Sequence, residues 1–348
     1  MTQTLPSARV PSICVIVPNF NDTRFISRCL RSVLDQDMAP DELIVVDDHS
    51  SDDSVGIIRS LITGHANASL VENEANLGVY GAIDQGLERS RSDYALFLSA
   101  NDFLLPGLIS RAKACLAQTP AAGLWSALAW QVDEQDRLLG LQSTAVVAMK
   151  DAYFTPETCR RLAWRFGNWF TGASLIYHRK TLDAVGRFDP AYKGLSDLIT
   201  ALAVASRRGA AYSPEPLAAI RVHSGGILSA TLADQTALDA MLERLARRGP
   251  ELSAELFTPE FLARTGRRFR FAAIRATGGA SLGEVAARAV GWRRTALALA
   301  DGLPRKLRLP PFALAFLVLR SYDVFPAIWN RVLGCLWVRL RSRWRAPT

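Results

Sequence analysis

A short apolar run, Tyr94 to Leu98, ends abruptly at Ser99-Ala100-Asn101-Asp102. Uninterrupted apolar runs of this length are typical of strands that are buried on both faces of a parallel sheet. Open α/β sheets bind their ligands at the carboxyl ends of such strands, so Asp102 is a candidate ligand-binding residue. Alternatively, Asp102 caps a following helix, because aspartate is a good N-cap and Pro106-Gly107 come next. This stretch alone leaves both interpretations open.

The segments before this run repeat the same arrangement. Apolar, β-branched runs alternate with segments whose apolar residues recur at helical spacing, which predicts βαβ units. The expected fold class is α/β, with a Rossmann-like, mostly parallel sheet flanked by helices. The second strand ends in Asp47-Asp48, so acids follow two strands that point the same way, and this favours a ligand site over a cap. The expected strands are 13–17, 42–46, 68–71 and 94–98, and the expected helices are 24–35, 51–62 and 79–89.

The pattern of strands and helices continues to about residue 230 and then changes. Beyond residue 230 the pattern predicts helices separated by Pro and Gly, and the chain becomes basic. We therefore expect an α/β domain over 1–230 and a basic, mainly helical region over 231–348. Within the first domain we also expect a hairpin over 124–132 and 137–141, strands over 170–177 and 217–222, and helices over 179–185 and 195–207.

The net charge of +8 is concentrated in the second region. Residues 1–230 carry 21 Lys and Arg against 24 Asp and Glu, a net of −3, whereas residues 231–348 carry 20 against 9, a net of +11. A basic region suits nucleic acid or an anionic membrane surface. The arginines are interleaved with long apolar runs and match no nucleic-acid-binding motif, which argues against a nucleic-acid partner.

Cysteine usage and the N-terminus bear on location. The five cysteines are scattered and form no Cys-x-x-Cys pair, so neither a zinc site nor a disulfide framework is expected, and a reducing compartment fits. Residues 1–12 hold no apolar segment typical of a secretory signal. We therefore expect a cytoplasmic protein.

The tail, residues 309–348, is expected to contact a membrane without crossing it. Its apolar run 312–319 is far shorter than the roughly 20 residues that a spanning helix needs. Trp329 and Trp337 stand among leucines and arginines, a composition that suits a helix lying in the headgroup region. This predicts a peripheral protein on the cytoplasmic face of the inner membrane. The alternative is a helix packed on the first domain with a solvated basic face.

Several segments, taken in order over roughly residues 12–230, resemble the family 2 glycosyltransferases, which share the nucleotide-sugar-binding GT-A fold. Several motifs in the right order are a far stronger signal than any single motif. The matching segments are Val15–Asn21 (opening strand and loop), Leu43–Asp52 (the VDDGSTD segment), Asn76–Gly78 (N-x-G), Ser99–Asp102 (the D-x-D metal motif), Leu195–Asp197 (the catalytic acid) and Arg221–His223 (R-x-H).

The resemblance implies an activity and a set of roles. It implies transfer of a sugar from a nucleoside-diphosphate donor, with a UDP-sugar expected, to a hydroxyl of a cell-surface glycan or lipid-linked acceptor. Asp197 would be the catalytic base of an inverting, single-displacement reaction. Asp102, and His223 with it, would hold Mg²⁺ or Mn²⁺, which prefer oxygen ligands and phosphate. The nucleotide would be bound by Pro18, Asn19, Asn21, Asp48, Asn76, Gly78 and Asn101.

The chain departs from the family pattern at several of these segments. His49 stands in place of the usual Gly after the Asp pair, and the metal motif carries the amide Asn101 in place of an acid. Asp197 is preceded by Ser196 rather than Glu and followed by Leu198 rather than an aromatic residue. These changes affect the predicted identity of the donor and the predicted strength of metal binding more than the predicted fold.

Two other functions are compatible with parts of the sequence. A protein that keeps the fold and binds nucleotide-sugar without turnover, as a scaffold, would also explain the altered residues around Asn101 and Asp197. A nicotinamide-binding Rossmann oxidoreductase would need a Gly-x-Gly-x-x-Gly turn after the first strand. That turn reads Pro18-Asn19-Phe20-Asn21 here, which argues against the oxidoreductase.

Overall fold

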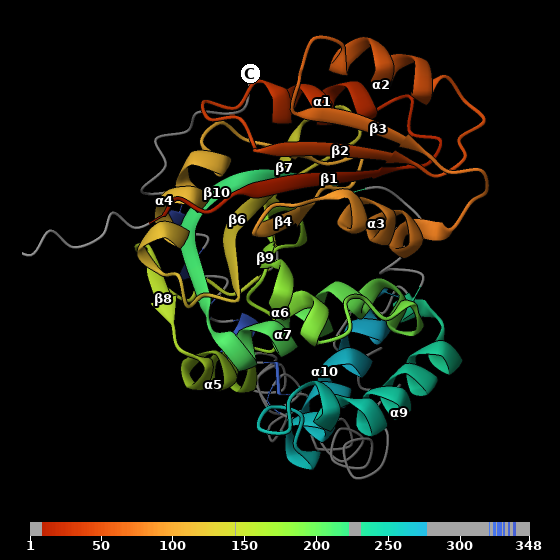
Figure 1. The fold of residues 1–348 in the computed structure, drawn as a ribbon. Helices are drawn as coiled ribbons and strands as arrows, with labels where there is room; N and C mark the ends of the chain where they lie inside the picture. The colour runs from red at the N-terminus through yellow and green to blue at the C-terminus, as the bar shows by residue number, and fades with distance from the viewer. Residues whose placement is uncertain are drawn as a thin grey trace, which may run out of the picture.

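The computed structural model describes residues 9–142, 144–222 and 231–276, and short stretches between 320 and 338. Its centre is a ten-stranded mixed sheet (Figure 1) with the strand order β3-β2-β1-β4-β9-β6-β10-β5, in which β7 pairs with β6 and β8 with β10. The strands are β1 (Ile13–Asn19), β2 (Glu42–Asp47), β3 (Ala68–Glu72), β4 (Tyr94–Phe97), β5 (Phe103–Leu104), β6 (Leu124–Val132), β7 (Leu138–Leu141), β8 (Ala152–Phe154), β9 (Ile176–His178) and β10 (Ala210–Arg221).

Most of the long strands run in one direction. β3, β2, β1 and β4 pair in parallel, and β10 pairs in parallel with β6. β6 also runs in the direction of β4, because both pair antiparallel with β9 between them. The carboxyl ends of β1, β2, β4, β6 and β10 therefore lie at one edge of the sheet. The predicted α/β class with a mostly parallel sheet is confirmed.

Helices cover both faces of this sheet (Figure 1), because alternate side chains of each strand point to opposite faces. In β1, Ile13, Val15 and Val17 pack into a hydrophobic cluster with α1, α2 and α4, whereas Cys14 and Ile16 pack into another with α3 and α7. The helices are α1 (Ile26–Leu34), α2 (Ser54–Ile62), α3 (Gly78–Arg89), α4 (Leu108–Gln118), α5 (Pro156–Phe166), α6 (Arg179–Ala184), α7 (Ser196–Arg208), α9 (Gln235–Leu252) and α10 (Pro259–Ala276).

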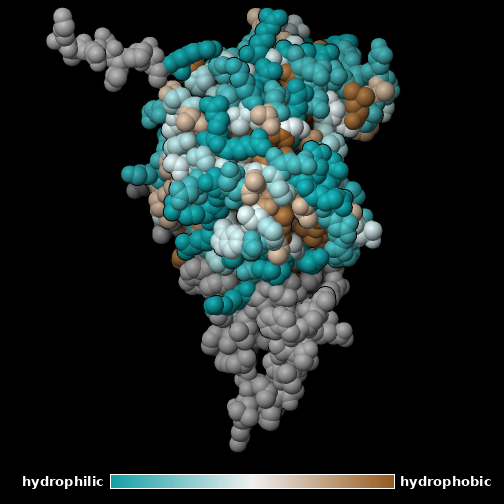
Figure 2. Space-filling view, turned by 60° about the horizontal axis from the view of Figure 1, so that its bottom comes forward, coloured by the Kyte–Doolittle hydropathy of each residue, from teal (hydrophilic) through white to brown (hydrophobic). Residues whose placement is uncertain are grey.

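The helical region after residue 230 packs against the sheet domain. Leu238 and Met241 of α9 and Phe261 of α10 belong to the same hydrophobic cluster as α3 and α7. Figure 1 shows α9 and α10 at the end of the molecule away from α1 and α2. In Figure 2 that end is turned forward, and its mostly hydrophilic surface carries hydrophobic residues near the middle of the face.

The membrane prediction falls mainly outside the described residues. Most of 309–348 lies outside them, as does the segment 223–230 around the expected domain boundary. Of the helices that the structure describes, none is long and apolar enough to cross a membrane.

The strand predicted over 170–177 is wrong except for its last two residues. Gly172–Ser174 forms a 3₁₀ turn, here η1, and only Ile176–His178 enters the sheet as β9. The Ser174 hydroxyl donates to the Ala127 carbonyl at 2.6 Å and accepts from the Ala127 N–H at 3.0 Å. The side chain thus satisfies backbone groups of β6 that a neighbouring strand would otherwise pair.

The last strand is longer than predicted. β10 begins at Ala210 rather than at residue 217, although its sequence contains Pro214 and Pro216. Register shifts around Ser213 and Pro216 accommodate these prolines, because a bulge tolerates residues that donate no hydrogen bond.

Candidate functional site

The two acids at the end of β2 have different surroundings. Asp47 is buried, and its Oδ1 accepts from Asn19 Nδ2 at 2.7 Å and from the Ser50 hydroxyl at 2.6 Å. Its Oδ2 accepts from the Ser50 N–H at 2.9 Å. Asp47 therefore holds the loops after β1 and β2 together, and its oxygens are committed to the protein.

Asp48 links the end of β2 to the start of α3. Its Oδ1 accepts from Asn73 Nδ2 at 2.8 Å and from the Leu77 N–H at 2.9 Å. Its Oδ2 accepts no hydrogen bond from a described residue. Asn19 Oδ1, at the end of the neighbouring strand, is likewise buried without a partner in this part of the chain. Both oxygens could accept from ribose hydroxyls or base N–H groups.

Left-handed backbone shapes this edge of the sheet. His49 has φ +67° and Asn21 has φ +54°, and such conformations favour glycine. This accounts for the preference for glycine at the position that His49 occupies. Asn21 Oδ1 accepts from the Ser51 N–H at 2.8 Å, so its side chain orders the loop. Pro18, in β1, pairs with Val46 of β2.

Asn76 and Gly78 form the turn that starts α3. Asn76 Oδ1 accepts from the Gly78 N–H at 2.9 Å, and Gly78 has φ +75°. A Cβ added at Gly78 would meet no atom within 4 Å, so only its backbone conformation requires glycine. The structure therefore places the predicted nucleotide-binding residues Asn19, Asp48, Asn76 and Gly78 around the ends of β1 and β2 and the start of α3.

Asp102 is held by the end of β10 rather than by a helix. Its Oδ1 accepts from the Arg221 N–H at 2.8 Å. The N-cap of α4 is Gly107, so Asp102 does not cap that helix. The pKa of Asp102 is raised to about 7, mainly by desolvation and in part by the nearby Asp22 carboxylate, while the Arg221 N–H and guanidinium act in the opposite direction. A carboxylate held in this way is poised to accept a cation.

The Arg221 side chain joins the loops that follow three strands. Its Nε donates to the Asn101 carbonyl at 3.0 Å, one terminal nitrogen donates to the Asp133 carbonyl at 2.7 Å, and the other donates to Asp136 Oδ1 at 2.6 Å. The guanidinium also lies 4.4 Å from the centre of the Phe25 ring. Arg221 therefore fixes the backbone that presents Asn101 and Asp102.

The surroundings of Asp102 fit a divalent cation that takes most of its ligands from substrate phosphates and water. Asp102 Oδ2 accepts no hydrogen bond from a described residue, and Mg²⁺ commonly binds one or two carboxylates together with substrate phosphates and water. Across the residues that the structure describes, no three His, Cys, Asp or Glu side chains gather in a metal-holding group. His223, the other predicted ligand, lies outside the described residues.

Asp197 lies in the first turn of α7, beside η1. A Cβ added at Gly172 would lie 3.3 Å from Asp197 Oδ2, so the carboxylate faces that turn closely. Asp197 is exposed, yet the protein around it partly desolvates the carboxylate and raises its pKa. An accessible but partly desolvated carboxylate lies in a recess rather than on a convex surface, and such a group is suited to accept a proton.

Contacts connect Asp197 to the other two acids. η1, which faces Asp197, packs against β4 and β5 on either side of Asp102. On the other side, the Tyr80 hydroxyl of α3 donates to the Lys193 carbonyl at 2.5 Å, just before α7. Burial and the Asp197 charge raise the pKa of Tyr80 to about 12. Asp197 therefore has neighbours on the α3 side, where Asp48 lies, and on the β4 side, where Asp102 lies.

Tyr80, Asp22 and the partners of Arg221 were not predicted. Arg221 was recognised only as part of a motif, and Tyr80 stands in a segment that shows ordinary helical spacing. Lys193, which accepts from Tyr80, has an unusual backbone for a non-glycine residue, with φ +46° and ψ −133°. No local sequence signal marks this position, and its carbonyl is held from a distant part of the chain by the Tyr80 hydroxyl.

A family model connects this geometry to known proteins. The model for glycosyl transferase family 2 matches residues 14–166, which include the ends of β1, β2 and β4 described above. Over this segment the chain matches glycosyl transferase family 2. The predicted resemblance to this family is therefore confirmed.

Proteins similar to this chain come from several bacteria. It is 28% identical over 178 residues to an uncharacterized glycosyltransferase of Nostoc sp., covering 51% of this chain and 54% of the relative. It is 31% identical over 102 residues to the GalNAc(5)-diNAcBac-PP-undecaprenol beta-1,3-glucosyltransferase of Campylobacter jejuni, covering 29% and 33%. The matched segments thus span about a third to a half of the length of these relatives.

The fold is also similar to that of a solved structure. The mannosyltransferase PcManGT of Pyrobaculum calidifontis, solved in complex with GDP-Man and Mn²⁺, aligns with a TM-score of 0.54 and 20% identity. The alignment covers 93% of this chain and 88% of that protein. The likeness shows a shared GT-A fold.

Proposed function

We propose that this protein is a metal-dependent, inverting glycosyltransferase. It would move a sugar from a nucleoside-diphosphate donor, with UDP-sugar as the expected class, to a hydroxyl of a cell-surface glycan or lipid-linked acceptor. The observation that carries the proposal is the arrangement of Asp48, Asp102 and Asp197 along one side of the sheet, in a chain whose residues 14–166 match the family 2 model. The relative from Campylobacter jejuni, whose name includes an undecaprenol-linked substrate, supports the lipid-linked class.

Donor binding is assigned to the ends of β1 and β2. Asp48 Oδ2 and Asn19 Oδ1 would accept hydrogen bonds from the nucleoside, since neither accepts one from a described residue. Asn76 and Gly78 would keep the adjacent turn in shape, and Pro18, Asn21 and Asn101 would line the same pocket.

The leaving diphosphate requires positive charge as the glycosidic bond breaks. Asp102 would hold Mg²⁺ or Mn²⁺, with His223 as a second ligand. The cation, when bound, neutralises charge on the leaving diphosphate. Arg221 keeps Asp102 and Asn101 in position through its backbone N–H and its guanidinium.

Asp197 would accept the proton of the attacking hydroxyl. Its raised pKa makes it a stronger base than an ordinary aspartate, and its accessible carboxylate leaves room for an acceptor. Attack on the face opposite the diphosphate gives a single displacement with inversion. We further propose that the protein works at the cytoplasmic face of the inner membrane.

Donor hydrolysis and sugar transfer in the presence of Mn²⁺ test this function. Asp197→Asn should lower turnover by about 100-fold or more, in the range usual for loss of a general base, while nucleotide binding stays unchanged. Asp53→Asn, which alters an exposed acid near α2, is the matched control and should keep full activity. Wild type that binds nucleotide but shows no turnover would instead support the inactive binding protein.

A further inference from the structure

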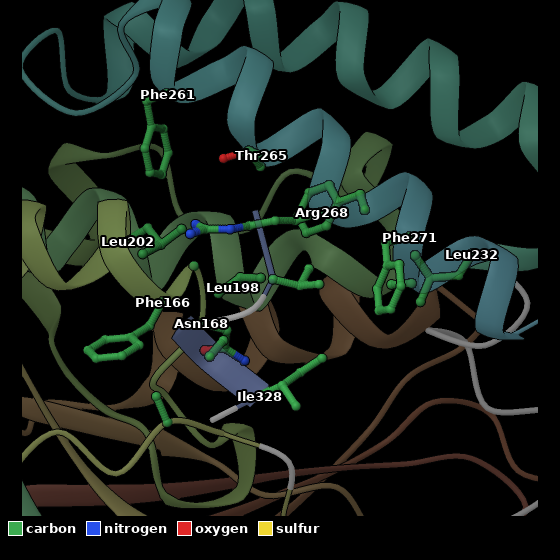
Figure 3. Close-up of a pocket in the computed structure, with 16 residues that line it drawn as sticks. Phe166, Asn168, Leu198, Leu202, Leu232, Phe261, Thr265, Arg268, Phe271 and Ile328 are labelled. Carbon is green, nitrogen blue, oxygen red and sulfur yellow. The ribbon is translucent and has the colours of Figure 1, made fainter. Parts of the chain in front are cut away.

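A cavity of about 560 Å³ lies between the sheet domain and α10 (Figure 3). Leu198 and Leu202 of α7 form one wall, and Phe261 and Phe271 of α10 form the opposite wall. The remaining described residues that line it include Phe166, Asn168, Leu232, Thr265, Arg268 and Ile328. The walls are therefore mainly apolar.

The size of this cavity points to a ligand. Protein interiors are close-packed, with few voids larger than a water molecule, and this volume would hold roughly 20 waters at liquid density. Small-molecule sites typically occupy about 300–1,000 Å³ with mostly apolar walls and a few polar groups. Water is a poor occupant for walls of this kind, whereas a hydrocarbon chain is well suited to them.

The polar groups beside the cavity carry excess positive charge. The Arg268 guanidinium donates to the carbonyls of Ala163, Trp164 and Arg165 and to the Asp323 carbonyl. Burial lowers its pKa to about 10, so it stays charged at neutral pH.

Two further arginines stand on the same helix. Arg264 and Arg267 pair with the Asp323 carboxylate, so three arginines face one acid. Two donors are left without a partner in the described part of the chain: Arg264 Nε and the Thr265 hydroxyl, both buried. An anionic headgroup with acceptor oxygens would match both the charge and the unpaired donors.

The cavity is also adjacent to the proposed catalytic base. Leu198, which lines the cavity, directly follows Asp197 on α7, and Leu202 lies one turn further along. A molecule whose sugar hydroxyl reaches Asp197 could thus extend its apolar part along α7.

We propose that this cavity binds the hydrocarbon chain of a lipid phosphate, with α10 arginines contacting its anionic head. This rests on the proposed function and deepens it, because it assigns the acceptor to the lipid-linked class. The occupant is a long-chain alcohol carrying phosphate or diphosphate, to which the acceptor sugar would be attached.

Calorimetric titration of the full-length protein with geranylgeranyl monophosphate tests the proposal. Ala272→Trp places a large side chain in the cavity wall and should weaken binding at least 10-fold. Ala240→Trp, at an exposed position of α9, is the matched control and should bind as wild type does. Ala327→Leu, a smaller change in the same wall, should weaken binding by a lesser factor. This variant still tests the proposal if Ala272→Trp does not fold.

Several outcomes would overturn the proposal. They are no binding by wild type, equal binding by Ala272→Trp, or equal binding of geranylgeraniol, which lacks the phosphate. Binding of inorganic phosphate as tight as that of the lipid phosphate would also count against it. Failure of the proposed function is distinguishable, because donor hydrolysis without acceptor depends on the sheet edge and should persist in Ala272→Trp.

Discussion

Replacing Arg221 with methionine should destabilise the protein more than any surface substitution. The Arg221 side chain is 2% exposed and donates to two backbone carbonyls and to Asp136. Methionine fills a similar volume but removes the hydrogen bonds to both carbonyls and the positive charge beside Asp102.

The expected loss follows from these contacts. Each hydrogen bond from the charged guanidinium to a carbonyl contributes about 1.5–3 kcal/mol. The Asp136 side chain is 43% exposed, so its ion pair adds less than about 1 kcal/mol. The contact with the Phe25 ring adds about 1 kcal/mol. We therefore expect Arg221→Met to lower the free energy of unfolding by about 4–8 kcal/mol, the sum of these ranges.

Urea denaturation at pH 7.5 measures this loss as a shift in midpoint at constant slope. Arg161→Met is the control, because the Arg161 and Glu157 side chains are 70% and 71% exposed and their pair should contribute less than about 0.5 kcal/mol. Arg221→Lys, which keeps the charge but lacks the forked geometry, should fall between the two. A loss below about 1 kcal/mol for Arg221→Met, or one equal to that of the control, would contradict the stabilising role of the buried Arg221 contacts.

Three further predictions concern the base, the α3 turn and the tail. Because the pKa of Asp197 is raised above 3.8, the acidic limb of kcat/KM should lie above that pH, and activity should fall below it as the carboxyl becomes protonated; an unaltered limb in Asp197→Asn would contradict this. Gly78→Ala and Gly64→Ala, both at positive φ and both in open space, should each lower stability by about 1 kcal/mol, but only Gly78→Ala should weaken nucleotide binding measured by calorimetry. Deletion of 309–348 should release the protein from anionic vesicles in sedimentation, and unchanged sedimentation would exclude the tail as the membrane contact.

The sequence predicted the local elements of the sheet domain well. The continuous apolar run 13–17 and the helical spacing in 24–35 are local patterns, which do not depend on distant residues. Parallel strands also share a direction, so the acids after the second and fourth strands could be predicted from the sequence to lie at one edge of the sheet. The elements η1, β5, β8, α4 and α5 were not predicted.

Long-range contacts decided which acids are available. Asp47 and Asp48 are equivalent in sequence, yet Asn19 and Ser50 occupy the oxygens of Asp47, while Asp48 keeps one oxygen unused by a described residue. Asp102 could have been a helix cap in sequence terms, but the N–H of Arg221, which is 119 residues away, accounts for its position.

Local residue patterns are enough to predict the α/β class, the edge of the sheet at which the acids gather and the resemblance to a known family. How β10 accommodates its prolines, why Lys193 has a positive φ beside Tyr80, and where a cavity opens next to α7 depend on the tertiary fold. The physical reason is that the hydrophobic period of a strand or helix is a property of a few neighbouring residues. Hydrogen-bond partners, desolvation and cavities depend instead on chain segments that folding brings together from far apart.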